Sequence, residues 1–313
     1  ERQRRLSLHR GAGSRPVRSR PRHGRSCAGR RHGGGIVIYT AGLDVGSTYT
    51  KALIQSDDEE IVGKAFGPTG FRLKEVARTM YDRALADAGL SEDDISYVIA
   101  TGGGRHHVDF KDLHVTDLTA SARGACFLFP GTRTILDVGG QTMKASRVDG
   151  SANVLSFRLN DKCAAGTGAF LEKTARYMGY GTEEIGALMS TSKEPVPISG
   201  VCAVFAESEV INHLSLGTPP ADIMQGAIES LTGRSVQLMR RVRAEPEFTL
   251  IGGILRFETM GRSVSESLEA DVNVPDGDMV QFVSALGCAI LGRRRLEKLH
   301  AGGGVPATSG TPK

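Results

Sequence analysis

The sequence LDVGSTYTKA at residues 43–52 recurs as LDVGGQTMKA at residues 136–145, with six of the ten positions identical. Each copy holds a short apolar run, an Asp, a Gly-containing turn and a second run, which predicts a strand, a tight turn and a returning strand. A repeat at a distance of 93 residues is too long for a solenoid and indicates two similar halves within one chain. The sequence therefore predicts a duplicated structure in which each half presents one Asp–Gly turn.

Both turns carry groups suited to a polyphosphate. Glycine lets backbone N–H groups approach a ligand, and hydroxyl and ammonium donors surround the turns: Ser47, Thr48, Thr50, Lys51, Thr142 and Lys144. Asp44 and Asp137 would repel a bare phosphate, so we expect Mg2+ between them and a nucleotide, coordinated partly through water. The alternative is that each Asp only caps its turn. Duplication with a Lys at the same offset favours nucleotide binding.

From Ile36 onward the sequence pattern alternates strands and helices. Strands are expected at 36–44, 50–55, 60–66, 96–101, 133–138, 142–148, 153–159 and 248–251, and helices at 73–89, 118–128, 168–178, 203–216, 221–243 and 278–298. In the last helix, small residues at 285, 287 and 289 would let a neighbouring helix approach closely. Strand hairpins followed by helices, occurring twice, predict an α/β protein of two lobes with a cleft between them. Ligands of such sheets bind at the loops where strands end.

The two ends of the chain differ in composition from the body. Residues 1–35 are rich in Arg, Gly, Ser and Pro, and are expected to be disordered. They could be a basic interaction arm, a transit-type leader or sequence translated upstream of the true start, and we favour the last. We expect an N-terminal lobe at 36–130, a C-terminal lobe at 131–300 and a disordered tail at 301–313.

Charge and composition exclude several classes of partner. The net charge of +4 includes 11 Arg and one Glu in residues 1–35, which leaves 28 Lys and Arg against 34 Asp and Glu, or −6, elsewhere. An acidic body argues against nucleic acid as a partner. No apolar run approaches the roughly 18 residues of a membrane span. Five scattered cysteines predict a reduced, cytoplasmic protein without structural disulfides.

Two cysteines directly precede expected helices. Cys163 and Cys202 would there be stabilised as thiolates by free N–H groups and the helix dipole, an environment that also suits an iron–sulfur cluster. Two thiolates do not complete a four-cysteine cluster, although an equivalent pair on a second subunit would. The alternative is that they are small buried residues, which we expect of Cys126 and Cys288.

Three other stretches invite a functional interpretation. Gly252-Gly253 follows an expected strand and could cradle an α-phosphate or let adenosine lie against the backbone, or could form an ordinary tight turn. Gly102-Gly103-Gly104 is expected to be a flexible connection between lobes, with Arg105 a surface charge. His106 and His107 are expected to lie in an extended segment and to face solvent. Neither the P-loop pattern nor the dinucleotide fingerprint occurs.

These motifs resemble those of the acetate and sugar kinase, chaperone and actin superfamily of ATPases. Within it, the chain is similar to the family of 2-hydroxyacyl-CoA dehydratase activators and ATP-binding subunits of ATP-dependent benzoyl-CoA reductase. The resemblance covers residues 38–298, and its most specific parts are NDKCAAGTGAFLE (160–172) and CAVFAESEV (202–210). LDVGGQTMKAS (136–146) and LIGGILRF (250–257) look closest to a benzoyl-CoA reductase subunit.

The resemblance implies two ribonuclease-H-like, actin-type ATPase lobes with a nucleotide cleft between them. It implies a first phosphate-binding loop with Asp44, Gly46, Ser47, Thr48, Thr50 and Lys51, and a second with Asp137, Gly139, Gly140 and Gln141. Gly252 and Gly253 correspond to the adenosine-binding turn. Cys163 and Cys202 would each donate a thiolate to one [4Fe-4S] cluster shared across a subunit interface.

The expected function is that of an ATP-hydrolysing, electron-activating subunit. Asp137 and Gln141 would position water and Mg2+. The implied partners are a reduced ferredoxin-type donor, a second related ATPase subunit or a second copy of this chain, and acyl-CoA-binding catalytic subunits that reduce benzoyl-CoA or a related aromatic acyl-CoA. One alternative is a homodimeric activator of 2-hydroxyacyl-CoA dehydratase. Others are a small-molecule kinase of the same superfamily, which would contain no iron, and a non-enzymatic nucleotide-dependent scaffold.

Overall fold

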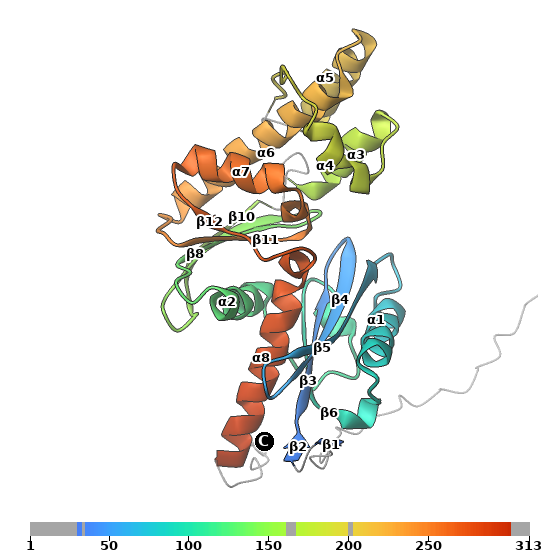
Figure 1. Ribbon diagram of the computed structural model, residues 1–313, viewed down its shortest axis with the longest axis vertical. Coiled ribbons are helices and arrows are strands. Elements are labelled where there is room, and N and C mark those ends of the chain that lie inside the picture. The colour runs from blue at the N-terminus through green and yellow to red at the C-terminus, as the bar shows by residue number, and fades with distance from the viewer. Residues whose placement is uncertain (1–29, 33–34, 161–166, 200–202, 302–313) are drawn as a thin grey trace, which may run out of the picture.

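The structure, a computed structural model, describes residues 30–32, 35–160, 167–199 and 203–301. It holds two five-stranded sheets, one in each half of the chain, that follow one another along the long axis of the molecule (Figure 1). Cys163 and Cys202 lie outside the described residues, as do most of residues 1–35. The part of this segment that is described forms a short antiparallel pair, β1 (Arg30–His32) with β2 (Gly35–Val37).

The first sheet has the strand order β5-β4-β3-β6-β7. Neighbours β3–β4 and β4–β5 are antiparallel, whereas β3–β6 and β6–β7 are parallel. Its strands are β3 (Tyr39–Val45), β4 (Tyr49–Ser56), β5 (Ile61–Pro68), β6 (Ile95–Thr101) and β7 (Leu113–His114). The repeated motif supplies the central hairpin of this sheet, β3 and β4.

The second sheet repeats the first, with the order β10-β9-β8-β11-β12 and the same pattern of parallel and antiparallel neighbours. Its strands are β8 (Thr134–Val138), β9 (Met143–Val148), β10 (Val154–Asn160), β11 (Phe248–Ile251) and β12 (Val272–Asn273). The two hairpins also share their register, because Asp44 pairs with Lys51 and Asp137 with Lys144. The predicted duplicated α/β architecture is confirmed.

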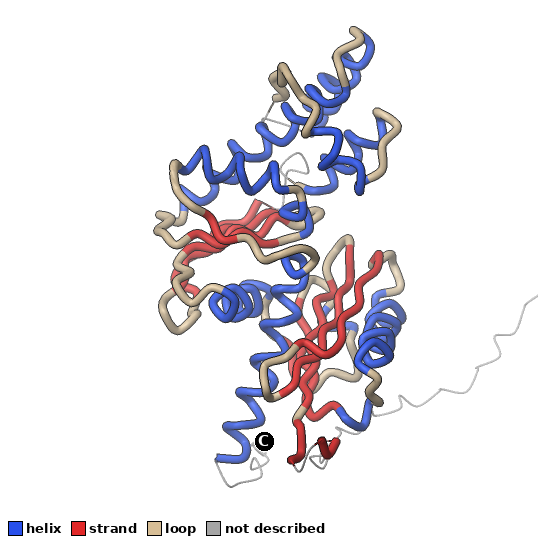
Figure 2. Tube along the Cα trace, in the orientation of Figure 1, coloured by secondary structure: helices blue, strands red, loops and turns tan. Residues whose placement is uncertain are grey.

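Helices cover both faces of each sheet (Figure 2). They are α1 (Leu73–Ala88), α2 (Asp117–Leu128), α3 (Gly168–Tyr177), α4 (Ile185–Met189), α5 (Ala203–Ser215), α6 (Pro220–Arg241), α7 (Glu258–Leu268) and α8 (Met279–Ala301). Helix α1 shows why they form: Ala77, Met80, Ala84 and neighbouring apolar residues recur at helical spacing and are buried. It ends at Gly89, whose φ of 63° is the left-handed conformation that closes a helix.

The two halves exchange their covering helices. Helix α1 packs on one face of the first sheet, and α8, from the other half of the chain, packs on the opposite face through Leu286 and Ile290 against Leu53. Helix α2 in turn contributes Ala122 and Ala125 to a cluster with Ile135 of the second sheet, whose other face carries α6 and α7. The lobes are therefore joined by packing as well as by the chain.

Small residues allow α8 to come very close to its neighbours. A Cβ on Gly287 would clash with the carbonyl oxygen of Ala120 in α2, and one on Gly42 in β3 would lie 2.8 Å from the amide nitrogen of Ala289. Thr40 donates a hydrogen bond to the Ala289 carbonyl over 3.0 Å. The predicted close approach of a neighbouring element to the small residues of this helix is confirmed.

Substituting Gly287 by Ala should therefore destabilise the fold. We expect a loss of about 2 kcal/mol in the free energy of unfolding, because the added methyl group meets backbone that cannot move away without separating α2 from α8. The matched control is Gly233→Ala in α6, where a Cβ meets nothing within 4 Å. That change should leave stability unchanged or raise it by about 0.5 kcal/mol through helix propensity. Equal effects in denaturant melts would contradict the packing argument.

The predicted elements match the structure closely, with several omissions. All eight predicted strands and six predicted helices are present, with ends shifted by up to about three residues. Helices α4 and α7 and strands β1, β7 and β12 were not predicted. His106 belongs to a 3-10 turn (Arg105–His107) rather than an extended segment, is exposed, and contacts the His114 ring. No helix among the described residues is long and apolar enough to cross a membrane.

Candidate functional site

Strands β3 and β8 end at one cavity that is lined by residues of both halves. Most of the residues predicted from the sequence line it together: Asp44, Gly46, Ser47, Thr48, Lys51, Asp137, Gly139, Gly140, Gly252 and Gly253. The shared register places each Asp beside a Lys, with Lys51 Nζ 3.0 Å from Asp44 Oδ2 and Lys144 Nζ 3.4 Å from Asp137 Oδ2. The duplication thus produces two equivalent carboxylate–ammonium pairs that face the same space.

The two turns also have the same backbone closure. The N–H of Gly46 donates to the Tyr49 carbonyl over 3.2 Å, and that of Gly139 donates to the Thr142 carbonyl over 2.9 Å. The turns touch each other, since a Cβ on Gly140 would lie 2.8 Å from the Cβ of Thr48. The hydroxyl of Thr48 is buried and has no hydrogen-bond partner among the described residues. A buried hydroxyl in this position can donate to a ligand phosphate without first breaking a bond within the protein.

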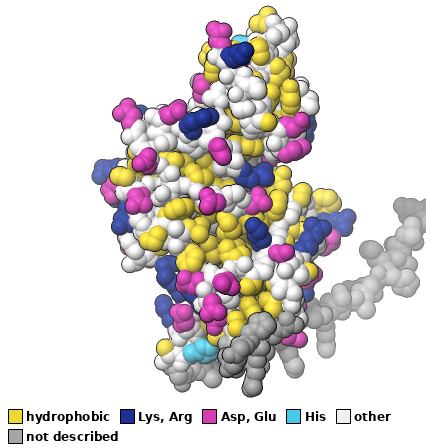
Figure 3. All heavy atoms as spheres, in the orientation of Figure 1, with side chains coloured by type: hydrophobic (Ala, Val, Ile, Leu, Met, Phe, Trp, Pro, Cys, Tyr) yellow, Lys and Arg dark blue, Asp and Glu magenta, His cyan; other side chains and the backbone are white. Residues whose placement is uncertain are grey.

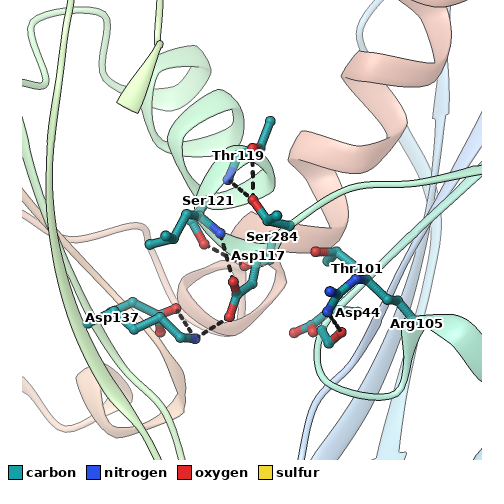
Figure 4. Close-up of polar contacts among 12 residues, drawn as sticks. Asp44, Thr101, Arg105, Asp117, Thr119, Ser121, Asp137 and Ser284 are labelled. Carbon is teal, nitrogen blue, oxygen red and sulfur yellow. Dashed lines mark hydrogen bonds and ion pairs between the residues drawn. The ribbon is translucent and has the colours of Figure 1, made fainter. Parts of the chain in front are cut away.

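A third carboxylate belongs to the site and was not predicted. Asp117, the first residue of α2, lies 2.7 Å from Lys144 Nζ, which also contacts Asp137 (Figure 4). Thr116 precedes it and caps the helix by accepting a hydrogen bond from the Thr119 N–H. The sequence offered a signal, because Thr-Asp before an apolar helix is typical of a helix start. It did not show that this start points into the cleft.

The charges of the site act on one another. Burial raises the pKa of Asp137 above its ordinary value, although Lys144 opposes the shift. Burial also raises the pKa of Asp117, but the charge and hydrogen bond of Lys144 outweigh it, so the net shift is downward. Burial lowers the pKa of Lys144, and the charges of Asp137 and Asp117 more than reverse this. Lys144 therefore stays protonated, and Asp117 stays ionised at neutral pH.

This donor set fits a magnesium ion bound together with a nucleotide. Mg2+ prefers carboxylate oxygen, water and phosphate oxygen, and usually takes only one or two protein carboxylates. Among the described residues, no three His, Cys, Asp or Glu side chains are close enough to hold a metal ion by themselves. The carboxylates Asp44, Asp117 and Asp137 would therefore act through water and through phosphate-bound metal.

The end of the cavity near β11 has a different character. Gly252 has φ 104° and ψ 157°, and a Cβ there would lie 2.9 Å from the Val138 amide nitrogen. Only glycine adopts this conformation readily. Beside it the cavity is lined by Ile254, Glu172 and Thr182. An apolar side chain, a flat glycine backbone and a few polar groups suit a nucleoside better than a phosphate.

Some predicted site residues do not line the cavity. Thr50 is fully buried, and its hydroxyl lies 2.9 Å from that of Thr69, which donates to the Gly46 carbonyl over 2.9 Å. Thr50 therefore supports the first turn from behind instead of facing a ligand. Gln141 is exposed to solvent on the second turn and is not among the lining residues. Cys163 and Cys202 fall outside the described residues.

The Gly102–Gly104 segment is not a connection between lobes, contrary to the expectation. It packs on the end of β3, where the N–H of Gly104 donates to the Val45 carbonyl over 2.9 Å, and Gly102 and Gly103 line the cavity. Arg105 is half-buried rather than a free surface charge. It donates from Nη1 to the Gly102 carbonyl over 2.9 Å.

Two sheets of one topology, each delivering an Asp–Lys turn to a shared cavity, define an ATPase of the actin type. The chain belongs to the BadF/BadG/BcrA/BcrD ATPase family, whose pattern matches residues 41–292. Membership supports ATP binding and hydrolysis.

The relatives that are similar to this chain are of two kinds. The 2-hydroxyisocaproyl-CoA dehydratase activator of Clostridioides difficile is 36% identical, over 81% of this chain and 94% of its own length. A benzoyl-CoA reductase subunit of Thauera aromatica is 35% identical, over 83% of this chain and 95% of its own. A solved structure of the Clostridium difficile activator with bound ADPNP is 34% identical, with a TM-score of 0.80 over 87% of this chain and all of that chain.

Proposed function

We propose that this chain hydrolyses ATP to drive electron transfer to an acyl-CoA enzyme. The observation that carries the proposal is the interlobe cavity with its two Asp–Lys turns, which fits MgATP. The relatives favour an activator of a 2-hydroxyacyl-CoA dehydratase over the benzoyl-CoA reductase component expected from the sequence, because an activator also supplies the similar structure with bound ADPNP. The similarity to the Thauera aromatica reductase keeps the reductase as the second candidate.

In the proposed reaction, water attacks the γ-phosphorus, the bond from that phosphorus to the bridging oxygen breaks, and ADP and phosphate are released. Asp44, Asp137 and Asp117 would hold the Mg2+ ion and its water, and Lys51 and Lys144 would offset charge on the phosphates. Gln141 stands on the second turn and would orient the attacking water once the lobes close around the nucleotide.

Hydrogen bonds connect the second turn to α3, and an ion pair connects α3 to α5. At the start of α3, the N–H of Gly168 donates to the Gly139 carbonyl over 3.0 Å, and that of Ala169 donates to the Gly140 carbonyl over 2.8 Å. Helix α3 is linked to α5 by Lys173 and Glu207, 2.7 Å apart. A change in the turn on hydrolysis would therefore displace both helices. In the sequence, Cys202 directly precedes α5, and Cys163 lies five residues before the start of α3.

The two cysteines would provide half of the ligands of a [4Fe-4S] cluster, so a second chain must complete the site. The bound cluster would supply a carrier for one electron, received from a reduced ferredoxin-type donor. The surface next to Cys202 in the sequence suits a subunit contact, because Val204, Phe205, Ile211 and Leu216 are 67%, 62%, 49% and 72% exposed. Figure 3 shows hydrophobic side chains along the projecting end of the molecule that carries α5.

The cluster assignment has a direct test in anaerobically purified protein. The wild-type protein should be brown, contain iron and sulfide, and hydrolyse ATP. Cys163→Ala should be colourless and retain nucleotide binding, because the removed thiolate would be a ligand of the cluster and not of the nucleotide. Cys126→Ala is the matched control and should keep full iron content, since that cysteine is a half-buried thiol of α2. Retention of the cluster in Cys163→Ala would refute the ligand assignment.

The two candidate functions differ in their partners. Anaerobic co-purification of the tagged chain should yield a homodimer that associates transiently with a dehydratase if it is an activator. A stable complex with a different ATPase chain and acyl-CoA-binding subunits would favour the reductase. Iron-free protein that phosphorylates a small molecule would overturn both.

A further inference from the structure

We propose that Arg105 contacts the γ-phosphate and lets the site distinguish ATP from ADP. The inference rests on the proposed nucleotide site and adds a residue that the repeated turns do not contain. It concerns the Gly-rich turn after β6, which the sequence had placed outside the site.

The turn after β6 is the structural equivalent of the turn after β11. Each follows a strand that pairs in parallel with the Asp-bearing strand of its own sheet. Gly102 has φ 84° and Gly252 has φ 104°, and a Cβ on either would clash with the carbonyl oxygen of the last residue of that strand, Val45 or Val138. Both glycines line the cavity. Each lobe therefore presents one glycine turn of this kind to the cavity, as expected of a duplicated fold.

A nucleotide is not symmetric, so its two ends must use the two turns differently. The turn at Gly252 has the apolar Ile254 and the half-buried Glu172 beside it, which suit a nucleoside. The turn at Gly102 lies against Asp44, whose Oδ1 would be 2.6 Å from a Cβ on Gly102. A triphosphate that runs from the first of these turns past Gly139 and Gly140 has its terminal phosphate nearest the second. The γ-phosphate end of the cavity is thus the Gly102 end.

Arg105 follows this turn and is held by it just behind the lining residues Gly102 and Gly103, without lining the cavity itself. Its Nη1 donates to the Gly102 carbonyl over 2.9 Å, and its Nε is buried without a hydrogen-bond partner among the described residues. Figure 4 shows Arg105 beside Asp44 and Thr101, on the side of the cleft opposite Asp137. Its charge contributes to the lowered pKa of Asp117. A guanidinium has five N–H donors, so the bond to Gly102 leaves donors for a phosphate oxygen.

This arrangement gives the terminal phosphate a partner that ADP lacks. Guanidinium–phosphate contacts are charge-assisted and often bidentate, and burial near the cleft strengthens them. With ADP bound, Arg105 keeps only its bond to the Gly102 carbonyl. Gly102 and Gly104 pack closely against the end of β3. A shift of Arg105 toward the phosphate would therefore also displace the first turn, which follows β3.

The equivalent turn supplies a matched control. Arg256 also folds back on a glycine carbonyl three residues earlier, donating from Nε to Gly253 over 3.1 Å, but it lines the nucleoside end of the cavity. Its loss should weaken ATP and ADP analogues by similar factors. Loss of Arg105 should weaken only the triphosphate.

The test is calorimetric titration of the full chain with Mg-ADPNP and with Mg-ADP. Arg105→Ala should bind ADPNP about tenfold or more weakly, the usual loss for one charge-assisted contact, while its ADP affinity stays within about twofold. Arg105→Lys should fall between wild type and Arg105→Ala, since an ammonium cannot form the bidentate contact. Thermal melts at wild-type temperature would show that the variants are folded.

The possible outcomes distinguish a failure of the proposed role of Arg105 from a failure of the proposed function. If Arg105→Ala weakens both nucleotides equally, or neither, Arg105 does not sense the γ-phosphate, although the nucleotide site stands. If an unfolded Arg105→Ala prevents the measurement, Arg105→Lys decides by the same ratio of ADPNP to ADP affinity. If the wild-type chain binds neither nucleotide, the proposed function itself fails.

Discussion

Replacing Asp137 by Asn should lower kcat for ATP hydrolysis by about 100-fold or more, with nucleotide affinity changed only a few-fold. Asn matches Asp in size, and Lys144 keeps its contact with Asp117 at 2.7 Å, so the fold should survive. What would be lost is the negative charge that we propose orients Mg2+ and its water in the transition state, and interactions of this kind commonly contribute about 100- to 1000-fold. Steady-state kinetics together with ADPNP titration separate the two parameters.

The control for this variant is Asp149→Asn. Asp149 is also an Asp that precedes a Gly in a turn, and it accepts hydrogen bonds from Ser151 and Asn153 at the surface. Its substitution should leave kcat within about twofold, because it lies outside the cavity. If Asp137→Asn kept full turnover, the essential carboxylate would be a different one, and Asp117 would be the next residue to substitute.

Substituting Gly252 by Ala should abolish nucleotide binding and destabilise the protein by about 3 kcal/mol. Its φ of 104° and ψ of 157° are open to glycine but strained for other residues, at a cost of about 1–3 kcal/mol. The added methyl group would also clash with the backbone of Val138, directly behind the second turn. Relief would require moving β11 away from β8, which carries Asp137.

The neighbouring Gly253 provides a close comparison. Its φ is not in the left-handed region, and a Cβ would meet only the Gln281 side chain, at 4.0 Å. Gly253→Ala should therefore unfold like the wild type in a thermal melt, yet bind ADPNP more weakly because its methyl group enters the cavity. Similar melting temperatures for both variants would show that the strain at Gly252 is overestimated.

Much of this fold was accessible from the sequence because the decisive pattern occurs twice. An Asp and a Lys seven residues apart, with a Gly turn between them, fix a hairpin and its register, and the second copy excludes coincidence. The elements that escaped prediction have weaker patterns. Strands β7 and β12 have only two residues each, too few for any periodicity. Helix α7 has apolar residues at 260, 264 and 268, but polar residues and a Gly dilute the pattern.

The site was harder to predict where tertiary contacts decide a side chain's role. Thr50 has a hydroxyl that could donate to a phosphate. Because side chains alternate between the two faces of a strand, however, this one points into the core beside Thr69. Asp117 is far from both turns in the sequence, and only the packing of α2 between the sheets brings it to Lys144. Gly102 and Gly252 each open a Gly-Gly pair after a strand, but such pairs also form ordinary tight turns, so only the topology shows that the two are equivalent. The roles of Gln141, Cys163 and Cys202 stay predictions.

The exchange of covering helices between the lobes has a consequence for synthesis of the protein. The first sheet is complete by residue 114, but one of its faces is covered by α8, which begins at residue 279. Until that helix leaves the ribosome, Leu53 lacks most of its apolar cover, because the other buried residues of its cluster all belong to α8. One face of the first sheet therefore stays partly exposed while well over a hundred further residues are translated. A nascent chain stalled before α8 should be a preferred client of chaperones that bind unfolded apolar segments.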